Sequence, residues 1–162
     1  MKETTRKIMG SAGLALGLCL AAGVATARAQ GTGAGRLDGT WDIVLTLRNC
    51  TTGGIGATFR ELATFDRGGT MVSSTSAFSQ ATKTPGHGVW QHLAGQTYTY
   101  SFKFFRFDAA TGAFLGWTVI RQEAVLDSSG DAYTAAGGAS VYSKEGVEVA
   151  SGCSTTEATR FQ

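Results

Sequence analysis

The chain has 162 residues, of which 43% are hydrophobic and 16% charged, with 23 Gly, one Pro and three Cys. This composition excludes a disordered polar chain, a collagen-like repeat and a multi-span membrane protein, and it allows one domain with a hydrophobic core. The net charge is +2 and falls to about −1 without the export signal predicted below. This low charge and the absence of a basic cluster in the sequence exclude the charge pattern of a nucleic-acid-binding protein.

The N-terminus has the pattern of a cleavable export signal. A basic start precedes an apolar run from Ile8 to Val24, and two Ala-x-Ala cleavage sites follow, ending at Ala27 and Ala29. The run has about 17 residues, whereas a membrane-spanning helix needs about 20. We therefore predict a signal peptide over residues 1–29 and export to the periplasm or the extracellular space.

The cysteines agree with export. Cys19 is lost with the signal, and the bulky Leu18 before it argues against lipid attachment. Cys50 and Cys153 remain, and two thiols of a small domain in an oxidising compartment usually pair. Neither has another Cys or a His within four residues, which argues against a zinc site. We predict a Cys50–Cys153 disulfide and neither a metal nor another cofactor.

The remaining chain is predicted to form a flexible leader over residues 30–38 and one all-β domain over residues 39–162. Short runs rich in Thr, Val, Phe and Tyr recur between Gly, Asp, Asn and Ser, and no stretch after residue 30 has sustained helical spacing. Because the connections are short, consecutive strands should pair as a meander. The predicted strands are residues 40–48, 58–66, 70–77, 88–93, 96–107, 113–126, 132–143 and 147–160.

The predicted disulfide favours a closed barrel over an open sheet, because it links the first strand to the last. If Cys50 lies opposite Cys153 in an antiparallel pair, Trp41 faces Gln162, and the two strands share one apolar side and one polar side. We therefore predict an eight-stranded antiparallel up-and-down barrel closed by pairing of strands one and eight.

A small outer-membrane barrel is the alternative, since it also has eight strands and an export signal. Such barrels carry an apolar outer belt and end in an aromatic residue. Here the predicted outer side carries Thr46, Arg48 and Glu157, and Phe161 is followed by Gln162. We expect a soluble monomer that does not span a membrane.

Two short motifs suggest a family resemblance. Gly39-Thr40-Trp41 opens the first strand, and Arg160 lies on the same face near the end of the last. In these residues the chain resembles the lipocalin (calycin) group, in which a Gly-x-Trp motif, shared with avidin-like barrels, starts the first strand and a late Arg or Lys packs over the Trp. The resemblance implies a structural Trp41–Arg160 pair at a closed barrel end. The sequence pattern lacks the Thr-Asp-Tyr motif and the long helix of animal lipocalins. In its overall pattern the chain is also similar to small exported bacterial β-barrel proteins without an assigned function.

The densest aromatic stretch alternates strictly. Tyr98, Tyr100, Phe102 and Phe104 share one face opposite polar residues, so that face should be the inner one. With Trp41, these rings are predicted to contact a small apolar or aromatic ligand in the lumen. The alternative is that they fill the core.

Small residues of the last two strands leave both alternatives open, because rings on one wall either interdigitate with small residues on another or leave a space. Beyond Phe104 the pattern slips: Phe105 and Phe107 are apolar on the opposite face, which indicates a bulge or a covering segment.

A second candidate region holds the single Pro, His87 and Trp90. Glycines on both sides of His87 favour a ligand-gating loop at the barrel mouth, with His87 and Trp90 as its candidate residues, or else a rigid turn that leads into the fourth strand. His87 and His92 are five residues apart and lie on opposite faces of a strand, so they are not expected to bind a metal together.

Glu61 is the weak candidate for a catalytic residue. It alternates with Phe59, Ala63 and Phe65 and would point inward, where a carboxylate needs a partner such as Arg106 or Arg121. The alternative is that the other face is the inner one, or that Glu61 lies at a rim. No Gly-x-Ser-x-Gly elbow or recognisable pair of carboxylates is present.

These observations lead to one expected function and two alternatives. The chain is expected to be an exported barrel that binds a small hydrophobic ligand in its lumen and is not an enzyme. It is otherwise an isomerase or cyclase that acts on a hydrophobic substrate, or a solidly packed barrel that binds a partner through its loops.

Overall fold

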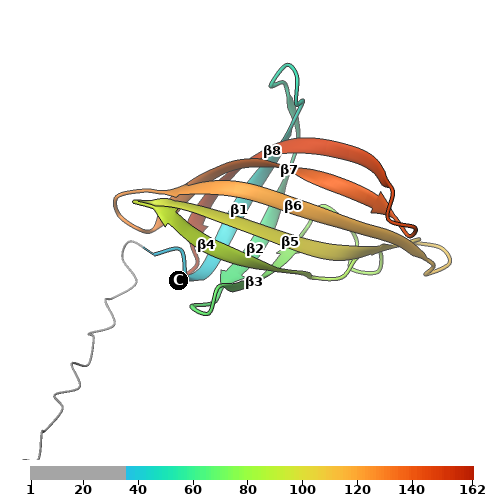
Figure 1. The fold of residues 1–162 in the computed structure, drawn as a ribbon, viewed down its shortest axis with the longest axis horizontal. Coiled ribbons are helices and arrows are strands. Elements are labelled where there is room, and N and C mark those ends of the chain that lie inside the picture. The colour runs from blue at the N-terminus through green and yellow to red at the C-terminus, as the bar shows by residue number, and fades with distance from the viewer. Residues whose placement is uncertain (1–35) are drawn as a thin grey trace, which may run out of the picture. The chain divides into compact units, whose positions relative to one another are not determined.

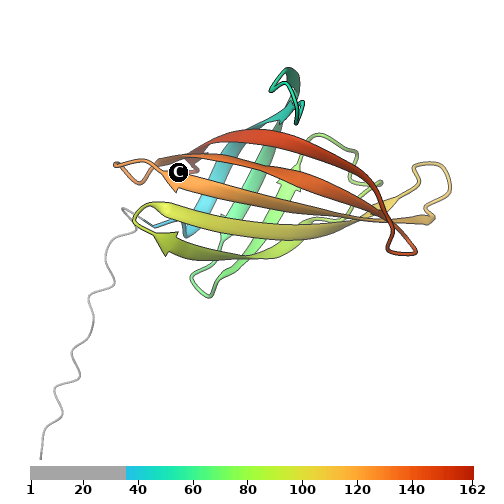
Figure 2. The same ribbon diagram turned by 45° about the horizontal axis from the view of Figure 1, so that its top comes forward.

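The computed structural model describes residues 36–162, and the predicted signal peptide over residues 1–29 lies outside the described residues. Eight antiparallel strands form a closed barrel in which each strand pairs with the next and β8 pairs with β1 (Figures 1 and 2). The strands are β1 (Gly39–Arg48), β2 (Ile55–Phe65), β3 (Thr70–Thr75), β4 (Gly86–Ala94), β5 (Thr97–Phe107), β6 (Phe114–Leu126), β7 (Ala132–Ser143) and β8 (Glu148–Arg160). The all-β fold, all eight predicted strands and the closure of the barrel are confirmed.

Alternation of side chains places the core inside the barrel. On β1, Trp41, Ile43 and Leu45 are buried, and β5 buries its aromatic residues from Tyr98 to Phe104 in the same alternating way. A strand turns successive side chains to opposite faces, so these two strands present their rings and branched chains to the lumen. Within residues 36–162, no helix is long and apolar enough to cross a membrane.

The β1–β8 register corrects the predicted one. Trp41 lies opposite Arg160 rather than Gln162, and Cys153 lies opposite Arg48. The prediction was wrong by two residues because it paired Cys50 with Cys153 as if both lay in strands, whereas Cys50 lies beyond the end of β1, in the connection between β1 and β2. A shift of two residues keeps every side chain on its own face, and the predicted inner and outer sides are therefore correct.

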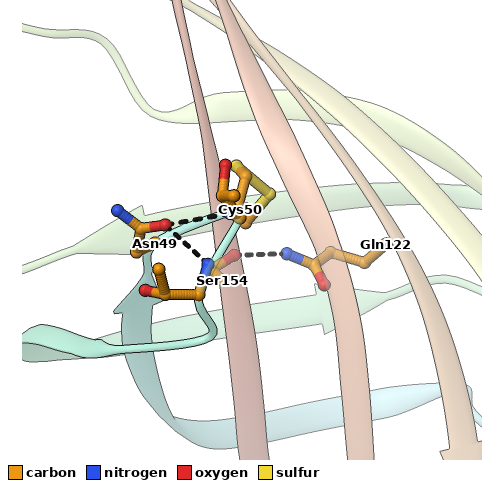
Figure 3. The surroundings of a disulfide bond; sticks show 7 residues. Asn49, Cys50, Gln122 and Ser154 are labelled. Carbon is orange, nitrogen blue, oxygen red and sulfur yellow. Dashed lines mark hydrogen bonds between the residues drawn. A yellow bond between two sulfur atoms is a disulfide. The ribbon is translucent and has the colours of Figure 1, made fainter.

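The disulfide joins this connection to β8 near the mouth of the barrel (Figure 3). The Cα atoms of Cys50 and Cys153 are 5.2 Å apart, within the ordinary range for a disulfide. The side-chain oxygen of Asn49 accepts hydrogen bonds from the backbone N–H groups of Thr51 at 2.9 Å and Thr52 at 2.8 Å. This local turn holds Cys50 beyond the end of β1, where it reaches back to Cys153.

The barrel domain begins before Gly39, which corrects the predicted extent of the flexible leader. Leu37 is fully buried, and its carbonyl oxygen accepts a 2.9 Å hydrogen bond from the indole N–H of Trp41. Asp38 is 9% exposed and forms ion pairs with Arg36 at 2.9 Å and Arg67 at 3.0 Å. Residues 36–38 are therefore part of one end of the barrel.

Arg160 packs over this end. Its guanidinium carbon lies 4.3 Å from the centre of the Trp41 ring, and Nη1 and Nη2 donate to the carbonyl oxygens of Asp38 and Arg36 at 2.8 and 2.9 Å. Nη2 also donates to the carbonyl oxygen of Gly130 at 2.6 Å. The arrangement that the lipocalin resemblance implied for Trp41 and Arg160 is thus present, and we call this end the closed end.

The opposite end, the mouth, is shaped by the connection between β3 and β4. β3 has six residues and pairs with β4 at four positions, after which residues 76–85 cross toward β5. The backbone of Lys83 forms an isolated antiparallel β-bridge with that of Arg106. Next to it, the N–H of Thr84 donates to the Phe105 carbonyl at 3.1 Å, and the N–H of Phe107 donates to the Thr82 carbonyl at 2.8 Å. We call residues 76–85 the strap. The strap is the covering segment predicted for the end of β5, and the register shift between Arg106 and Phe107 in the β5–β6 pairing is the predicted bulge.

Candidate functional site

The lumen is filled with rings toward the closed end. Trp41 meets Tyr133 edge-on with ring centres 4.8 Å apart, and Phe65 meets Tyr100 in the same way at 5.3 Å. Tyr98 is 4% exposed and belongs to the same buried cluster. Edge-to-face contacts at these distances are favourable aromatic packing. This half of the barrel is therefore core.

Toward the mouth the lumen contains a cavity of about 230 Å³. A cavity of about 150 Å³ holds benzene, so this space suits about one ring with a short substituent or a medium-length alkyl chain. Its lining combines apolar residues with a few polar ones: Leu45, Leu47, Phe59, Glu61, Thr75, Phe78, Lys83, Phe102, Phe104, Arg106, Thr118, Ile120, Ala139, Val141, Gly152, Cys153 and Ser154.

The cavity exists because the last two strands contribute little volume. Ala139 of β7 and Gly152 and Ser154 of β8 line it together with the rings of Phe102 and Phe104 from β5. Large rings on one wall and small residues on others leave space here, whereas at the closed end Trp41 and Tyr133 fill it. Both sequence interpretations therefore apply, each to one half of the lumen.

The five residues predicted to contact a ligand are divided between these halves. Phe102 and Phe104 line the cavity. Trp41, Tyr98 and Tyr100 face inward but pack in the core and are not among the lining residues. This corrects the predicted ligand wall, because the alternation of β5 identifies the inner face but not the height along the barrel at which the packing stops.

Glu61 points into the cavity and is 6% exposed, so the expectation that it lies at a rim or on the outer face is wrong. Burial raises the pKa of Glu61 to about 7, an effect that the Ser73 hydroxyl and the charge of Lys83 reduce only in part. Glu61 therefore exchanges a proton near neutral pH, which is the range required of a general acid or base.

Two cations line the same cavity. Arg106, one of the two partners predicted for Glu61, is among the lining residues, whereas Arg121 is exposed on the outer face of β6. The second cation is Lys83 of the strap, 4% exposed, with its ammonium 4.7 Å from the centre of the Phe104 ring. Sequence reasoning missed Lys83 because the strap has no strand alternation from which an inward direction follows.

A polar layer borders the cavity. The side-chain amide of Gln122 donates to the Ser154 hydroxyl at 2.8 Å (Figure 3). Within residues 36–162, the Gln122 amide oxygen is buried without a hydrogen-bond partner. The hydroxyls of Tyr133 and Thr156 are buried beside the Tyr100 hydroxyl. Burial raises the pKa values of Tyr100 and Tyr133 above their ordinary range, so both remain neutral phenols.

His87 and Trp90 lie within β4, so the alternative of a loop at the mouth is wrong. Trp90 falls inside the predicted fourth strand, and β4 begins two residues earlier than predicted and so includes His87. His87 is exposed on the outer face. Trp90 is half-buried near the closed end, where its indole N–H donates to the Asp66 carbonyl at 2.8 Å. Among the described residues, no group of three or more His, Cys, Asp or Glu is placed to hold a metal ion.

Other hollows lie outside the lumen. A space of about 120 Å³ adjoins the mouth and shares Lys83, Phe104 and Arg106 with the main cavity. Two larger grooves, of about 560 and 600 Å³, border exposed residues of the outer surface such as Arg121 and Arg60. The lumen cavity is the hollow in which apolar walls and buried titratable groups meet, and it is therefore the candidate site.

Comparison with known proteins adds no family to this geometry. No family model matches the chain. No curated protein matches it either.

Proposed function

We propose that this protein binds a small apolar or aromatic molecule in the lumen cavity, as lipocalins do. The single observation that carries the proposal is the cavity of about 230 Å³ lined by Phe59, Phe102, Phe104 and Ile120. Binding of an apolar molecule against apolar walls lowers the free energy, because apolar surface leaves water and new dispersion contacts form.

Two further features support a lipocalin-like binding protein. Arg160 covers Trp41 at the closed end, as the resemblance implies, while the cavity lies toward the mouth. The disulfide between Cys50 and Cys153 suits the oxidising compartment to which the predicted signal would export the chain. The cavity also counts against the alternative of a solidly packed interaction module.

Isothermal titration calorimetry with indole and 1-octanol, two neutral probes of suitable size, tests the proposal. Ala139→Leu places extra volume in the cavity, and Ala136→Leu on the exposed face of the same strand is the matched control. We expect one-to-one binding of at least one probe by the natural protein and by Ala136→Leu, and at least tenfold weaker binding by Ala139→Leu. Absence of binding, or unchanged binding by Ala139→Leu, would exclude the lumen as the site.

A second candidate function is acid–base catalysis, favoured by the position of Glu61. Its carboxyl group has a pKa of about 7 and lies in an apolar cavity together with Lys83. A carboxylate in this position can take a proton from the carbon beside a ligand carbonyl, while the Lys83 ammonium stabilises the enolate oxygen. Return of the proton to another carbon would give an isomerase.

Proton exchange of a small ketone in heavy water tests this candidate without knowledge of the natural substrate. We expect the natural protein to accelerate the exchange of the protons beside the carbonyl of 2-octanone, measured by proton NMR. Glu61→Gln should abolish the acceleration, whereas Glu123→Gln on the exposed face of β6 should retain it. No acceleration by the natural protein would reject the catalytic candidate and leave the binding proposal intact.

A further inference from the structure

Two cations at the mouth of the cavity, Lys83 and Arg106, form no ion pair among residues 36–162. Lys83 is 4% exposed, and its ammonium lies on the Phe104 ring. Within residues 36–162 it has no carboxylate within ion-pair distance, and the charge of Glu61 acts on it from farther away. The Nε atom of Arg106 is buried without a hydrogen-bond partner among the same residues. Burying a cation or a donor without a partner is unfavourable, so an anion that pairs with the Lys83 ammonium and accepts from the Arg106 Nε would be stabilised here.

The geometry of Arg106 leaves this Nε free for an additional partner. Nη2 of Arg106 reaches across the position of Gly116 to the carbonyl oxygen of Tyr142, at a long 3.4 Å. Lys83 and Arg106 are bridge partners between the strap and β5, and both line the main cavity and the smaller adjoining one. The two cations therefore border one small region at the mouth.

The acidic group in the cavity forms no ion pair with either cation. Of the described residues that line the cavity, Glu61 is the one carboxyl group, and it lies beyond ion-pair distance of both Lys83 and Arg106. Its pKa of about 7 keeps it largely protonated in mildly acidic solution. The cavity thus carries an excess of positive charge beside apolar walls.

Resting on the proposed function, we propose that the ligand is a carboxylate: its anionic head lies between Lys83 and Arg106, and its apolar body lies against Phe59, Phe102 and Ile120. A carboxylate accepts hydrogen bonds from an ammonium and from a guanidinium Nε, and such charge-assisted bonds are the strong ones. The cavity volume limits the body to about one ring or a chain of about eight carbons. The ligand class is therefore a short aromatic or medium-chain carboxylic acid.

Matched pairs of acid and alcohol test this inference by calorimetry on the disulfide-bonded protein at pH 6. The probes are octanoate against 1-octanol, and 3-phenylpropanoate against 3-phenylpropan-1-ol. We expect the acid of at least one pair to bind at least tenfold more tightly than its alcohol. Lys83→Gln and Arg106→Gln should each weaken binding of that acid at least tenfold and change binding of the alcohol less than threefold.

Two further variants keep the test decisive. Lys83→Arg retains the charge and should retain the preference for the acid, which covers the case that Lys83→Gln does not fold. Lys103→Gln removes a cation that packs on Phe105 and Trp117 on the outer face, and it should change neither affinity. If the alcohols bind and the acids bind no more tightly, the carboxylate inference is overturned and the binding proposal stands. If no probe binds, both are overturned.

Discussion

Arg160 joins three separate segments at the closed end through one planar group. Its guanidinium donates to backbone oxygens of Arg36, Asp38 and Gly130 and lies on the Trp41 ring. A lysine ammonium is a compact charge that cannot reproduce this fork of donors or its stacking on the ring. The type of cation therefore matters here, and not only the charge.

We expect Arg160→Lys to lower the free energy of unfolding by about 2 to 4 kcal/mol, because hydrogen bonds from a charged group contribute about 1.5 to 3 kcal/mol each and are not additive. Urea denaturation measures the change. Arg121→Lys, on the exposed face of β6, is the matched control and should be neutral within about 0.5 kcal/mol. Equal effects of the two substitutions would contradict the proposed anchoring by Arg160.

Glu61 should make the protein less stable as the pH rises toward and through neutrality. Its pKa is raised from 4.5 to about 7 in the folded protein, so between these values the folded state binds a proton that the unfolded state has lost. The stabilisation is fully present below about pH 4.5 and is lost as the pH rises through about 7; a shift of this size amounts to about 3 kcal/mol. From other segments, the Ser73 hydroxyl and the charge of Lys83 act on Glu61. Tyr100 and Tyr133 also interact with it, and both stay neutral in this range.

Denaturation at pH 5, 6, 7 and 8 measures this slope. Glu61→Gln should remove most of the decrease and should be more stable than the natural protein at pH 8, since the neutral amide is buried without becoming charged. Glu123→Gln, exposed on β6, should keep the natural slope. An unchanged slope in Glu61→Gln would show that another group causes it.

At the residue scale, the sequence predicted well where a residue acts through its own strand. Alternation placed Trp41, Phe102 and Phe104 inside, and the Gly-x-Trp motif led to the Arg160 pair. It failed for Lys83, whose direction depends on how the strap crosses β5. A residue in an irregular segment has no period from which its surroundings follow.

Among the strands, β6 depends on one glycine at the mouth. Gly116 has φ of 126°, in a region that side chains rarely adopt, and a Cβ atom there would collide with the backbone oxygen of Tyr142. The same oxygen accepts a hydrogen bond from Nη2 of Arg106 at 3.4 Å. Gly116 thus supports both the β6–β7 pairing and the position of a cation in the candidate site.

We expect Gly116→Ala to destabilise the protein by about 3 kcal/mol or more, since strain and a backbone collision add. Gly112→Ala is the matched control, because Gly112 has φ of 68° in the β5–β6 turn and open space around its Cβ position. It should lose only about 1 kcal/mol. Chemical denaturation of both variants checks the difference, and equal losses would mean that φ alone, not the collision, determines the cost.

At the element scale, strands and turns were predictable while register was not. Period-two patterns and glycine-containing turns located every strand, and the predicted end of the first strand at Arg48 is correct. The β1–β8 register was wrong by two residues because Cys50, which lies beyond that end, was placed directly opposite Cys153. The position of Cys50 beyond Arg48 depends on the Asn49 turn. Local hydrogen bonds of this kind do not appear in an alternation pattern.

For the whole molecule, the disulfide constrains the pair of strands that closes the barrel. Cys50 and Cys153 are separated by 103 residues, and in the chain-entropy model a loop of about 100 residues corresponds to about 4 to 5 kcal/mol of stabilisation. We expect Cys50→Ser combined with Cys153→Ser to lower the free energy of unfolding by up to this amount. Guanidinium denaturation with and without a reducing agent measures it.

The double variant is also the control for the reducing agent, which should shift the midpoint of the natural protein and leave that of the variant unchanged. A variant as stable as the oxidised natural protein would refute the idea that the disulfide clamps the seam. Binding of 1-octanol by the reduced protein would report separately whether the mouth keeps its shape.

The barrel as a whole was predictable from the order of its strands and from the two cysteines, because short connections and one long-range link leave few topologies. The cavity could not be predicted from the sequence. Its volume is the small difference between the volume of the lumen and the volume of the side chains that several strands place in it. Ala139, Gly152 and Phe102 each looked compatible with both a filled and a hollow lumen, and their relative heights along the barrel decided the outcome.

The pairing of β1 with β8 has a consequence for how the chain folds. β1 and β2 can form a hairpin at once, but the other edge of β1 stays unpaired until β8, about a hundred residues later in the chain, is in place. Contacts this distant in sequence slow folding, and an open seven-stranded sheet exposes two edges to pairing with other chains. We therefore expect the closing of the barrel to be the slow step of folding and the interval before it to be when the chain is most open to aggregation.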